Sequence, residues 1–353
     1  MVRLLDLGYV SYLQSQTIYH AVAHCTTEAS QGTIIILNPR EPYVCIGYHQ
    51  VLEKEIDTEY CTQKRIPFLR REVGGGTVYL DKEQLFFQCI FPSGSVPMKV
   101  DNLYKLFLQP AVNTYRKMGL DARYRPANDI QIGDKKICGT GAGRIGDASV
   151  VVGNIMFDFD HGEMSRVLRV SSEAFRNKVC EAMENYVTSL RAELGYIPER
   201  EAVKGLLISE FERMLEVPLL RGSLTPDERR MVAELDGRFT DPGWLHEEGG
   251  KINGWIKITT DVRVMESKYR SAGGPIRVLL RLKNDTIDDI VISCEFAFHS
   301  QIDLKGLEDH LMGQPVEAGS LLRTIKSFYA SNDLQSAVIT PDDMVRAIMG
   351  EKN

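Results

Sequence analysis

Three consecutive glycines, Gly74, Gly75 and Gly76, constrain this chain more than any other feature of its sequence. Arg70 and Arg71 precede them, and the extended run Thr77–Leu80 follows. Glycine adopts positive φ angles and lets a ligand approach the main-chain amides. Neighbouring guanidinium groups offer charge and paired donors to an anion. The run predicts a loop that holds phosphate or carboxylate, with a plain hairpin turn beside a solvated basic pair as the alternative.

A second group of polar residues and glycines lies about 50 residues further on. Asn128 and Asp129 begin one extended run, and Lys135 and Lys136 begin the next after a Gly-Asp turn. A lysine in this place can direct its ammonium group into a site and stabilise charge on a carbonyl or phosphate oxygen. Taken alone, such a lysine pair is more often an exposed turn. The later glycines Gly139 and Gly153 favour a functional reading, because they again permit close backbone approach.

Composition excludes several classes of protein. With 42 basic and 48 acidic residues the net charge is −6, which argues against a general nucleic-acid binder. The seven cysteines form no CxxC pair, so we expect neither a disulfide framework nor a thiolate zinc site. No stretch approaches the roughly 18 apolar residues of a membrane span. We therefore expect a cytoplasmic protein that binds neither nucleic acid nor membrane.

Apolar periodicity predicts an α+β protein with two domains. We expect a large mixed-sheet domain over residues 1–245, and a linker with a small α+β domain over residues 246–353. The expected elements of the larger domain are a helix over 9–30, paired strands Thr33–Leu37 and Tyr43–Ile46, a helix over 52–65, and a helix over 101–119 that Pro110 kinks or interrupts. The glycines of residues 245–260 predict a hinge between the domains.

The two motifs, in this order and spacing, resemble the lipoate–protein ligase family, a branch of the biotin and lipoate attachment enzymes. The resemblance covers nearly the whole chain. The matching segments are Pro42–Gln50, the loop Arg70–Asp81, Asn128–Asp129, Lys136–Gly139 and Val187–Leu190. The loop follows the lipoate pattern rather than the biotin pattern.

The resemblance implies that lipoate and ATP form lipoyl-adenylate, from which the acyl group passes to a lysine of an acceptor protein. It implies Lys136 as the catalytic residue. The residues that it implies for ATP and adenylate binding are Arg71, Gly74, Gly75, Gly76, Thr77, Val78, Tyr79, Asn128, Asp129, Gly139 and Gly153. Mg²⁺ would enter with the phosphates, near Asn128 and Asp129, without a direct protein site. Expected acceptors are the lipoyl domains of 2-oxoacid dehydrogenase subunits, a glycine-cleavage carrier protein or a lipoate-binding protein of sulfur metabolism.

Three departures from the family pattern keep other functions open. Val73 stands where the family has Ser or Thr, and Leu80 and Val152 stand where it has His. These changes are compatible with a different acyl substrate, a different acceptor, or a binder of lipoyl domains that has lost turnover. A second alternative is an ATP-independent octanoyl or lipoyl transferase with Cys138 as a thioester-forming nucleophile. A small packed thiol is the simpler reading of Cys138.

Overall fold

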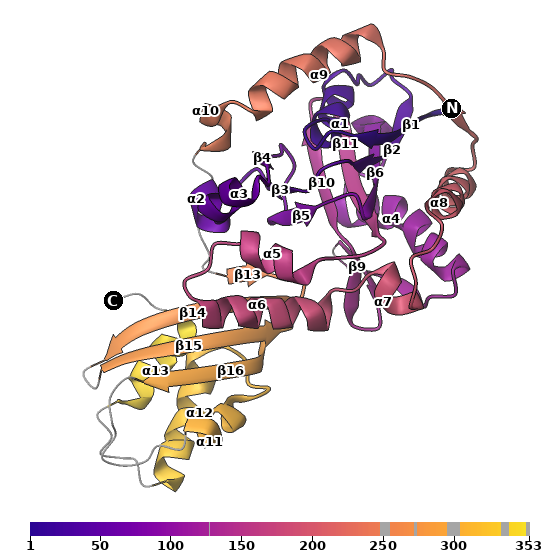
Figure 1. Cartoon of the computed structure of the whole chain (residues 1–353). Helices are drawn as coiled ribbons and strands as arrows, with labels where there is room; N and C mark the ends of the chain where they lie inside the picture. Colours follow the sequence, from indigo (N-terminus) through magenta and orange to yellow (C-terminus); the bar gives the residue numbers. More distant parts are fainter. Residues whose placement is uncertain (127, 248–254, 272–273, 295–303, 333–338, 351–353) are drawn as a thin grey trace. The chain divides into compact units, whose positions relative to one another are not determined.

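The computed structural model describes residues 1–126, 128–247, 255–271, 274–294, 304–332 and 339–350. The chain forms two compact units (Figure 1). The first unit comprises Met1–Arg169 and Tyr186–Ile252, and the second comprises Val170–Asn185 and Asn253–Asn353. Residues 248–254, which hold much of the expected hinge and its glycines, lie outside the described residues, and the division at residue 245 stays a prediction.

The first unit contains twelve strands among its described residues. They are β1 (Val2–Val10), β2 (Gly32–Pro39), β3 (Tyr43–Ile46), β4 (Phe68–Arg70), β5 (Val78–Leu80), β6 (Gln84–Pro92), β7 (Ala122–Arg125), β8 (Asp129–Ile132), β9 (Lys135–Cys138), β10 (Thr140–Ile145), β11 (Ala148–Met156) and β12 (Leu219–Arg221). Its helices are α1 (Gln14–His24), α2 (Leu52–Glu55), α3 (Thr58–Lys64), the 3₁₀ turn Ser93–Ser95, α4 (Val100–Lys117), α5 (His161–Val167), α7 (Leu190–Leu194), α8 (Arg200–Leu215), α9 (Pro226–Phe239) and α10 (Pro242–Leu245).

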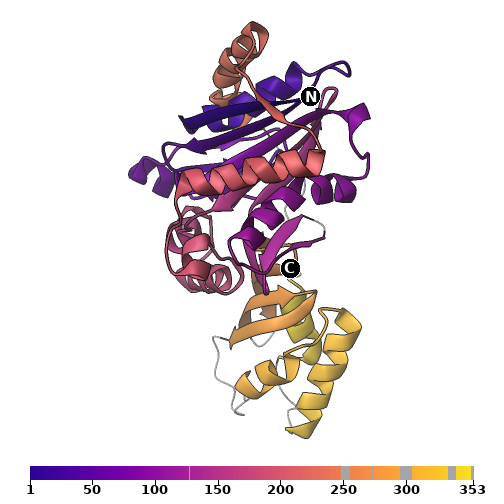
Figure 2. The same ribbon diagram turned by 90° about the vertical axis from the view of Figure 1, so that its right-hand side faces the viewer.

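A six-stranded mixed sheet, ordered β10-β11-β6-β2-β1-β12, forms the centre of this unit. The central strands β2 and β6 are buried on both faces, so their alternate residues enter different cores. Ile34 and Ile36 of β2 pack with residues of α4 and α8, whereas Ile35 and Leu37 pack with residues of α1 and α9. Figure 2 shows α8 lying across one face of the sheet. This layered core fixes the scaffold on which the loops of the unit stand.

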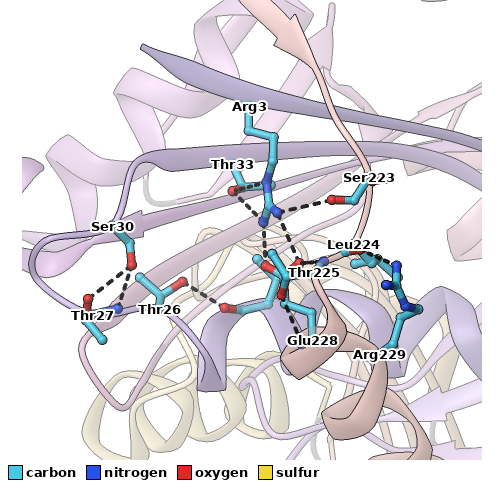
Figure 3. Close-up of polar contacts among 11 residues, drawn as sticks. Arg3, Thr26, Thr27, Ser30, Thr33, Ser223, Leu224, Thr225, Glu228 and Arg229 are labelled. Atoms are coloured by element: carbon cyan, nitrogen blue, oxygen red, sulfur yellow. Dashed lines mark hydrogen bonds and ion pairs between the residues drawn. The ribbon is translucent and has the colours of Figure 1, made fainter.

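A partly buried ion pair attaches α9 to the central sheet (Figure 3). Arg3 of β1 donates to Thr33 of β2 and to both carboxylate oxygens of Glu228, including a 3.0 Å bond from Nη1. Glu228 also completes the capping box of α9, because it accepts from the Thr225 amide at 2.7 Å. Burial acts to raise the pKa of Glu228, but the bonds from Arg3 and Thr225 leave this pKa below its ordinary value. The start of α9 is thereby fixed to two neighbouring strands.

Two small three-stranded sheets carry the sequence motifs. One has the order β4-β3-β5 and joins the strands on either side of the triple glycine. The other is an antiparallel meander, β7-β8-β9, which carries Asp129 on β8 and Lys136 on β9. The glycine loop and the lysine strand thus belong to different sheets.

The second unit is a four-stranded antiparallel sheet with helices. Its elements are α6 (Glu173–Tyr186, of which only the last residue belongs to the first unit), β13 (Trp255–Lys257), β14 (Val262–Ser271), β15 (Gly274–Lys283), β16 (Thr286–Cys294), α11 (Leu304–Leu311), α12 (Ala318–Ser331) and α13 (Pro341–Met349). The strand order is β13-β14-β15-β16. Apolar residues of β14, β15 and β16 share one core with α11, α12 and α13. Among the described residues of both units, no helix is long and apolar enough to cross a membrane.

The α+β class with mixed sheets is confirmed, but several element predictions were wrong in detail. The structure does not pair β2 with β3: β2 lies between β1 and β6, and β3 pairs with β4 and β5. Every residue of β2 is buried, which fits a central strand rather than one arm of a hairpin. The first helix spans only Gln14–His24, whereas α4 forms over nearly the expected range and is not interrupted at Pro110. The expected helix over 52–65 is two helices, because Asp57 caps a new start for α3.

Candidate functional site

The glycine loop is held in shape by Arg71, which follows β4. Its Nη2 donates to the carbonyl oxygens of Gly74 (3.1 Å) and Gly76 (2.8 Å), and its Nη1 donates to that of Cys45 (3.2 Å). The side chain is buried, and these acceptors all belong to the loop or to β3. A single guanidinium group therefore binds several carbonyl oxygens of the loop at once. Charge-assisted hydrogen bonds of this kind are among the stronger ones in proteins.

Glycine is required at two places where the loop passes the segment after β3. Gly75 has a φ of +112°, a conformation that residues with side chains rarely adopt. A methyl group on Gly47 would lie 2.1 Å from the Gly75 carbonyl oxygen, so no side chain fits there. The loop is also joined to α2, because Thr77 Oγ1 donates to Gln50 Oε1 and to Glu55 Oε2, each at 3.3 Å. Burial raises the pKa of Glu55 above its ordinary value.

Arg70 joins the glycine loop to α10 and the residues that follow it. Arg70 is 1% exposed, and among the described residues its acceptors are main-chain carbonyl oxygens. The acceptors are Tyr48 (2.7 Å), Gln50 (2.6 Å), Trp244 (3.1 Å), Leu245 (3.1 Å) and Glu247 (2.8 Å). The indole of Trp244 donates back to the Arg70 carbonyl oxygen at 3.1 Å. Arg70 is therefore a structural residue that joins two distant segments of chain at the loop.

Lys136 and Asp129 form an ion pair between neighbouring strands. Lys136 Nζ lies 2.8 Å from Asp129 Oδ1, and the exposed fractions of the two side chains are 17% and 0%. A buried carboxylate is costly unless it is paired, so Asp129 holds the ammonium group in place. Because Lys136 retains some exposure, its ammonium group can still meet a substrate oxygen. The sequence motif Asn128-Asp129 thus supplies the partner that positions the lysine.

The structure brings the two motifs together through Tyr104 on α4. The Tyr104 hydroxyl hydrogen-bonds the Asn128 side chain, and the charges of Arg71 and Asp129 both act on it. Burial is the main reason that the pKa of Tyr104 rises to about 12. Strand β10 connects the motifs as well, since a methyl group on Gly141 would lie 3.6 Å from the Gly74 carbonyl oxygen. Arg71, Tyr104 and the Asp129–Lys136 pair therefore define one candidate site.

Sequence reasoning missed Tyr104 and Glu55. Tyr104 belongs to the buried stripe of α4, and its spacing in the sequence is that of an ordinary core residue. Glu55 is one of several charged residues on a short polar helix. Nothing local marks either residue, because each acquires its role only when the sheets meet.

Other predicted site residues have mainly structural surroundings. Gly153 lies against the ring of Phe87, where a methyl group would be 2.3 Å from the nearest ring carbon. The Gly139 amide donates to Asn154 Oδ1 at 2.6 Å, which fixes the turn after β9. Val78 pairs with Cys45, and Tyr79 lies among the carboxylates of residues 81, 160 and 163.

The three side chains that depart from the family pattern pack in or against the core. Val73 is 1% exposed and Leu80 is 9% exposed, and both pack in the cluster between the central sheet, α1 and α9. Val73 also faces β10, where a methyl group on Gly143 would lie 3.0 Å from its Cγ1. Val152 is partly buried against the same cluster. Apolar side chains at these positions are explained by packing.

Cys138 and His20 are both buried and have structural surroundings. Cys138 is 0% exposed, lies in the core beneath α4, and has a pKa raised to about 12 by burial. A thiol of this kind is scarcely ionised at neutral pH. His20 Nδ1 lies 2.8 Å from the Gln16 carbonyl oxygen, and its Nε2 accepts from the Glu72 amide at 3.0 Å. His20 therefore joins α1 to the glycine loop, and burial lowers its pKa to about 4.

Comparison with known proteins places this geometry in a family. The model of the lipoyl protein ligase A/B catalytic domain matches residues 11–212, which is more than half of the chain. The chain belongs to this family. Among its relatives, lipoate-protein ligase A subunit 1 of Thermoplasma acidophilum is 29% identical over 253 residues, covering 69% of this chain and 95% of that protein. Octanoyltransferase LipM of Kyrpidia tusciae is 27% identical over 271 residues, covering 70% and 98%.

A solved structure has the same fold as the larger part of this chain. It comes from the structural analysis of an archaeal lipoylation system, a bipartite lipoate protein ligase and its E2 lipoyl domain from Thermoplasma acidophilum, and matches with a TM-score of 0.65 and 26% identity. The match covers 71% of this chain and 98% of that chain. Because relatives named for ligation and for octanoyl transfer both match, the comparisons support the wider class of lipoyl ligases and octanoyl transferases.

Proposed function

We propose that this family member is an ATP-dependent lipoate–protein ligase. The observations that carry the proposal are the ion pair of Lys136 with Asp129, the bonds of Arg71 to the glycine loop, and the burial of Cys138. Positive charge and main-chain amides suit a reaction that gathers negative charge on phosphate and carboxylate oxygens. The cysteine nearest to the lysine is poorly suited to be a nucleophile, which favours an adenylate over a thioester.

The proposed reaction has two steps. In the first, a carboxylate oxygen of lipoate attacks the α-phosphorus of ATP, and the bond to the leaving pyrophosphate breaks. In the second, the ε-amine of an acceptor lysine attacks the acyl carbonyl carbon, the bond to AMP breaks, and the amine loses a proton. Lys136 would stabilise charge on the acyl carbonyl and α-phosphate oxygens in both steps, with Asp129 fixing its position.

The remaining predicted residues have supporting roles in this proposal. The amides of Gly74, Gly75, Gly76, Thr77, Val78 and Tyr79 would line the nucleotide, while Asn128 and Tyr104 complete the polar wall. Gly139 lies beside Asn154 of β11, and Gly153 leaves room for the Phe87 ring of β6, so both permit the close packing that supports the site.

Mg²⁺ fits this site as an ion carried by the phosphates. Among the described residues, no group of three His, Cys, Asp or Glu side chains could hold a metal ion by itself. Mg²⁺ commonly uses one or two carboxylates together with substrate phosphates, so Asp129 and Asn128 are the residues that would face it. Its contribution there would be to neutralise phosphate charge.

The proposed partner is a lipoyl domain that presents a lysine. The similar bipartite ligase belongs to a lipoylation system that includes its E2 lipoyl domain, which supports an acceptor of this kind. Subunits of 2-oxoacid dehydrogenases, a glycine-cleavage carrier protein and lipoate-binding proteins of sulfur metabolism stay the predicted acceptors, and the cytoplasm stays the predicted location.

An ATP-independent octanoyltransferase is the second candidate. The octanoyltransferase relative, at 27% identity, favours it. Two other thiols, those of Cys25 and Cys180, are partly exposed. Cys180 hydrogen-bonds Glu184 on its own helix, α6. Burial is the main cause that raises the pKa of Cys25.

Mass spectrometry of a lipoyl domain separates the two candidates. The domain is incubated with the full chain and either ATP, Mg²⁺ and lipoate, or octanoyl-carrier protein without ATP. We expect a lipoyl adduct on one lysine only in the first mixture, and its loss in Lys136→Ala. Efficient octanoylation in the second mixture, with none in the first, would establish the transferase instead.

A further inference from the structure

A chain of side-chain hydrogen bonds runs between the two small sheets of the first unit. The Gly139 amide, which directly follows β9, donates to Asn154 Oδ1 at 2.6 Å. Asn154 Nδ2 donates to Gln84 Oε1 at 2.7 Å, and Gln84 Nε2 donates to the Tyr79 carbonyl oxygen of β5 at 3.2 Å. Asn154 and Gln84 thus connect the strand that carries Lys136 with the strand that follows the glycine loop.

The two linking side chains stand on neighbouring strands of the central sheet. In the antiparallel pair of β6 and β11, Gln84 lies opposite Met156 and Phe86 lies opposite Asn154. Gln84 and Asn154 are therefore diagonal neighbours on one face of the sheet. They are 1% and 6% exposed. Asn38 of β2 also donates to the Gln84 carbonyl oxygen at 2.8 Å, so the sheet provides a firm base for the chain of hydrogen bonds.

This chain of hydrogen bonds has a single direction. It begins at a main-chain donor, the Gly139 amide, and ends at a main-chain acceptor, the Tyr79 carbonyl oxygen. These two ends fix both side-chain amides: each accepts with its oxygen on the side of Gly139 and donates with its nitrogen on the side of Tyr79. A carboxylate in place of either amide would leave two oxygen atoms facing one another, which is costly in a buried network.

We propose that Gln84 and Asn154 are positioning residues that hold the strand of Lys136 in a fixed position relative to the glycine loop. Both act through main-chain groups, since Gly139 follows the lysine strand and Tyr79 belongs to the strand after the loop. The catalytic consequence rests on the proposed ligase function, whereas the connection between the two strands does not.

A carboxyl group placed in this chain of hydrogen bonds makes its effect depend on pH. In Asn154→Asp the protonated carboxyl accepts from Gly139 with one oxygen and donates its O–H to Gln84, so the direction is kept. The ionised carboxylate has no donor and breaks the chain. Burial favours the neutral form of a carboxyl group and raises its pKa. The variant should therefore match the wild type at low pH and depart from it as the pH rises through this raised pKa.

Two titratable groups of the native protein face the linking amides. The Cys138 thiol contacts the Asn154 main chain, and burial raises its pKa to about 12. Asp81, in the turn before β6, hydrogen-bonds the Gln84 side chain, and burial raises its pKa to about 6. Both groups are also present in the wild type. Each variant is therefore compared with the wild type at the same pH, so that their titration cancels.

The test uses the full chain with Asn154→Asp and with Gln84→Glu. Gln63→Glu is the matched control, because it makes the same chemical change at an exposed position of α3, where Gln63 donates to Glu59 of its own helix at 3.3 Å. Circular dichroism first shows that each variant is folded. If Asn154→Asp does not fold, Gln84→Glu carries the test.

Two readouts follow between about pH 6 and 9, the range in which a buried carboxyl group titrates. The first is hydrogen exchange of the Leu80 amide, which belongs to the same peptide group as the Tyr79 carbonyl and lies at the far end of the chain from Asn154. The second is the split between kcat and KM for lipoylation.

We expect Leu80 exchange in Asn154→Asp and Gln84→Glu to be about tenfold faster than in the wild type at about pH 9 and close to it at about pH 6. The control Gln63→Glu should match the wild type throughout. We also expect kcat relative to the wild type to fall roughly tenfold over this range, with KM for lipoate within about twofold, since a displacement of about 1 Å can cost as much as 100-fold.

Two results would overturn the proposal. One is unchanged Leu80 exchange at about pH 9 in the folded Asn154→Asp variant, and the other is a kcat ratio that does not fall as the pH rises. If the wild type neither lipoylates an acceptor nor exchanges pyrophosphate, the proposed function fails, and the exchange of the Leu80 amide alone decides whether Asn154 and Gln84 connect the two strands.

Discussion

Arg70→Met tests how far a single buried side chain holds the glycine loop in place. In the native protein five N–H groups of Arg70 donate to five main-chain carbonyl oxygens, drawn from the segment after β3 and from the end of α10. Trp244, which supplies one of these carbonyls, is buried, whereas Tyr48 and Glu247 are exposed. Methionine keeps much of the side-chain volume but leaves the acceptors without their donors.

The expected loss of stability follows from this geometry. A buried acceptor left unsatisfied costs about 1–3 kcal/mol, and exposed carbonyls recover much of their loss by bonding water. Removing the charge also relieves the cost of burying a guanidinium, which makes the five bonds less than additive. We therefore expect Arg70→Met to lower the free energy of unfolding by about 3–5 kcal/mol, in the range seen when a buried charge network loses one partner.

Denaturant unfolding monitored by tryptophan fluorescence measures this change. Arg230→Met is the matched control, because Arg230 is 73% exposed and pairs with Asp227 on its own helix, and we expect an effect of at most about 0.5 kcal/mol. A loss below about 1 kcal/mol in Arg70→Met would refute the reasoning. It would mean that the contacts of Arg70 are replaced by water without cost.

Three further predictions concern the core around the site. Cys138→Ala should keep lipoylation within about twofold of the wild type, and the native thiol should resist alkylation until the protein unfolds; a loss of activity of 100-fold or more would restore Cys138 as the nucleophile. Gly153→Ala should lower the free energy of unfolding by about 1–3 kcal/mol in denaturant titration, because its methyl group would overlap the Phe87 ring; unchanged stability would show that the ring moves freely. Burial lowers the pKa of His20 from 6.5 to about 4, so unfolding takes up a proton between these values. Stability should accordingly fall by about 3 kcal/mol as the pH drops from 6.5 to 4, measured by urea unfolding against pH, and this part of the pH dependence should be absent in His20→Gln.

Much of the candidate site could be predicted because its residues are adjacent in sequence. The glycine loop is a local feature, since Gly75 needs a positive φ and Arg71 can reach the carbonyl groups of its own loop. Likewise, a short turn brings Lys136 next to β8, where Asp129 lies. Local patterns of this kind require no knowledge of the tertiary fold.

The missed parts depend on distant segments. Strand β2 pairs with β1 and β6, inside the sheet, where both of its faces are buried. The sequence near the turn Asn38–Pro42 is equally typical of a hairpin, so it does not reveal this pairing. Strands β1 and β14 were overlooked, and they lie inside sheets where tertiary pairing decides the conformation. Tyr104 joins the site only because α4 packs beneath the two motifs. The hydrogen bond between Gln84 and Asn154 joins residues 70 positions apart.

Lipoate-dependent exchange of pyrophosphate into ATP tests the central claim most directly, because it detects the adenylate without needing the acceptor protein. The account predicts exchange with wild-type protein, lipoate and Mg²⁺, and a loss of at least about 100-fold in Lys136→Ala, in line with the removal of a group that stabilises the transition state. Absence of exchange in the wild type, together with octanoyl transfer that needs no ATP, would contradict it.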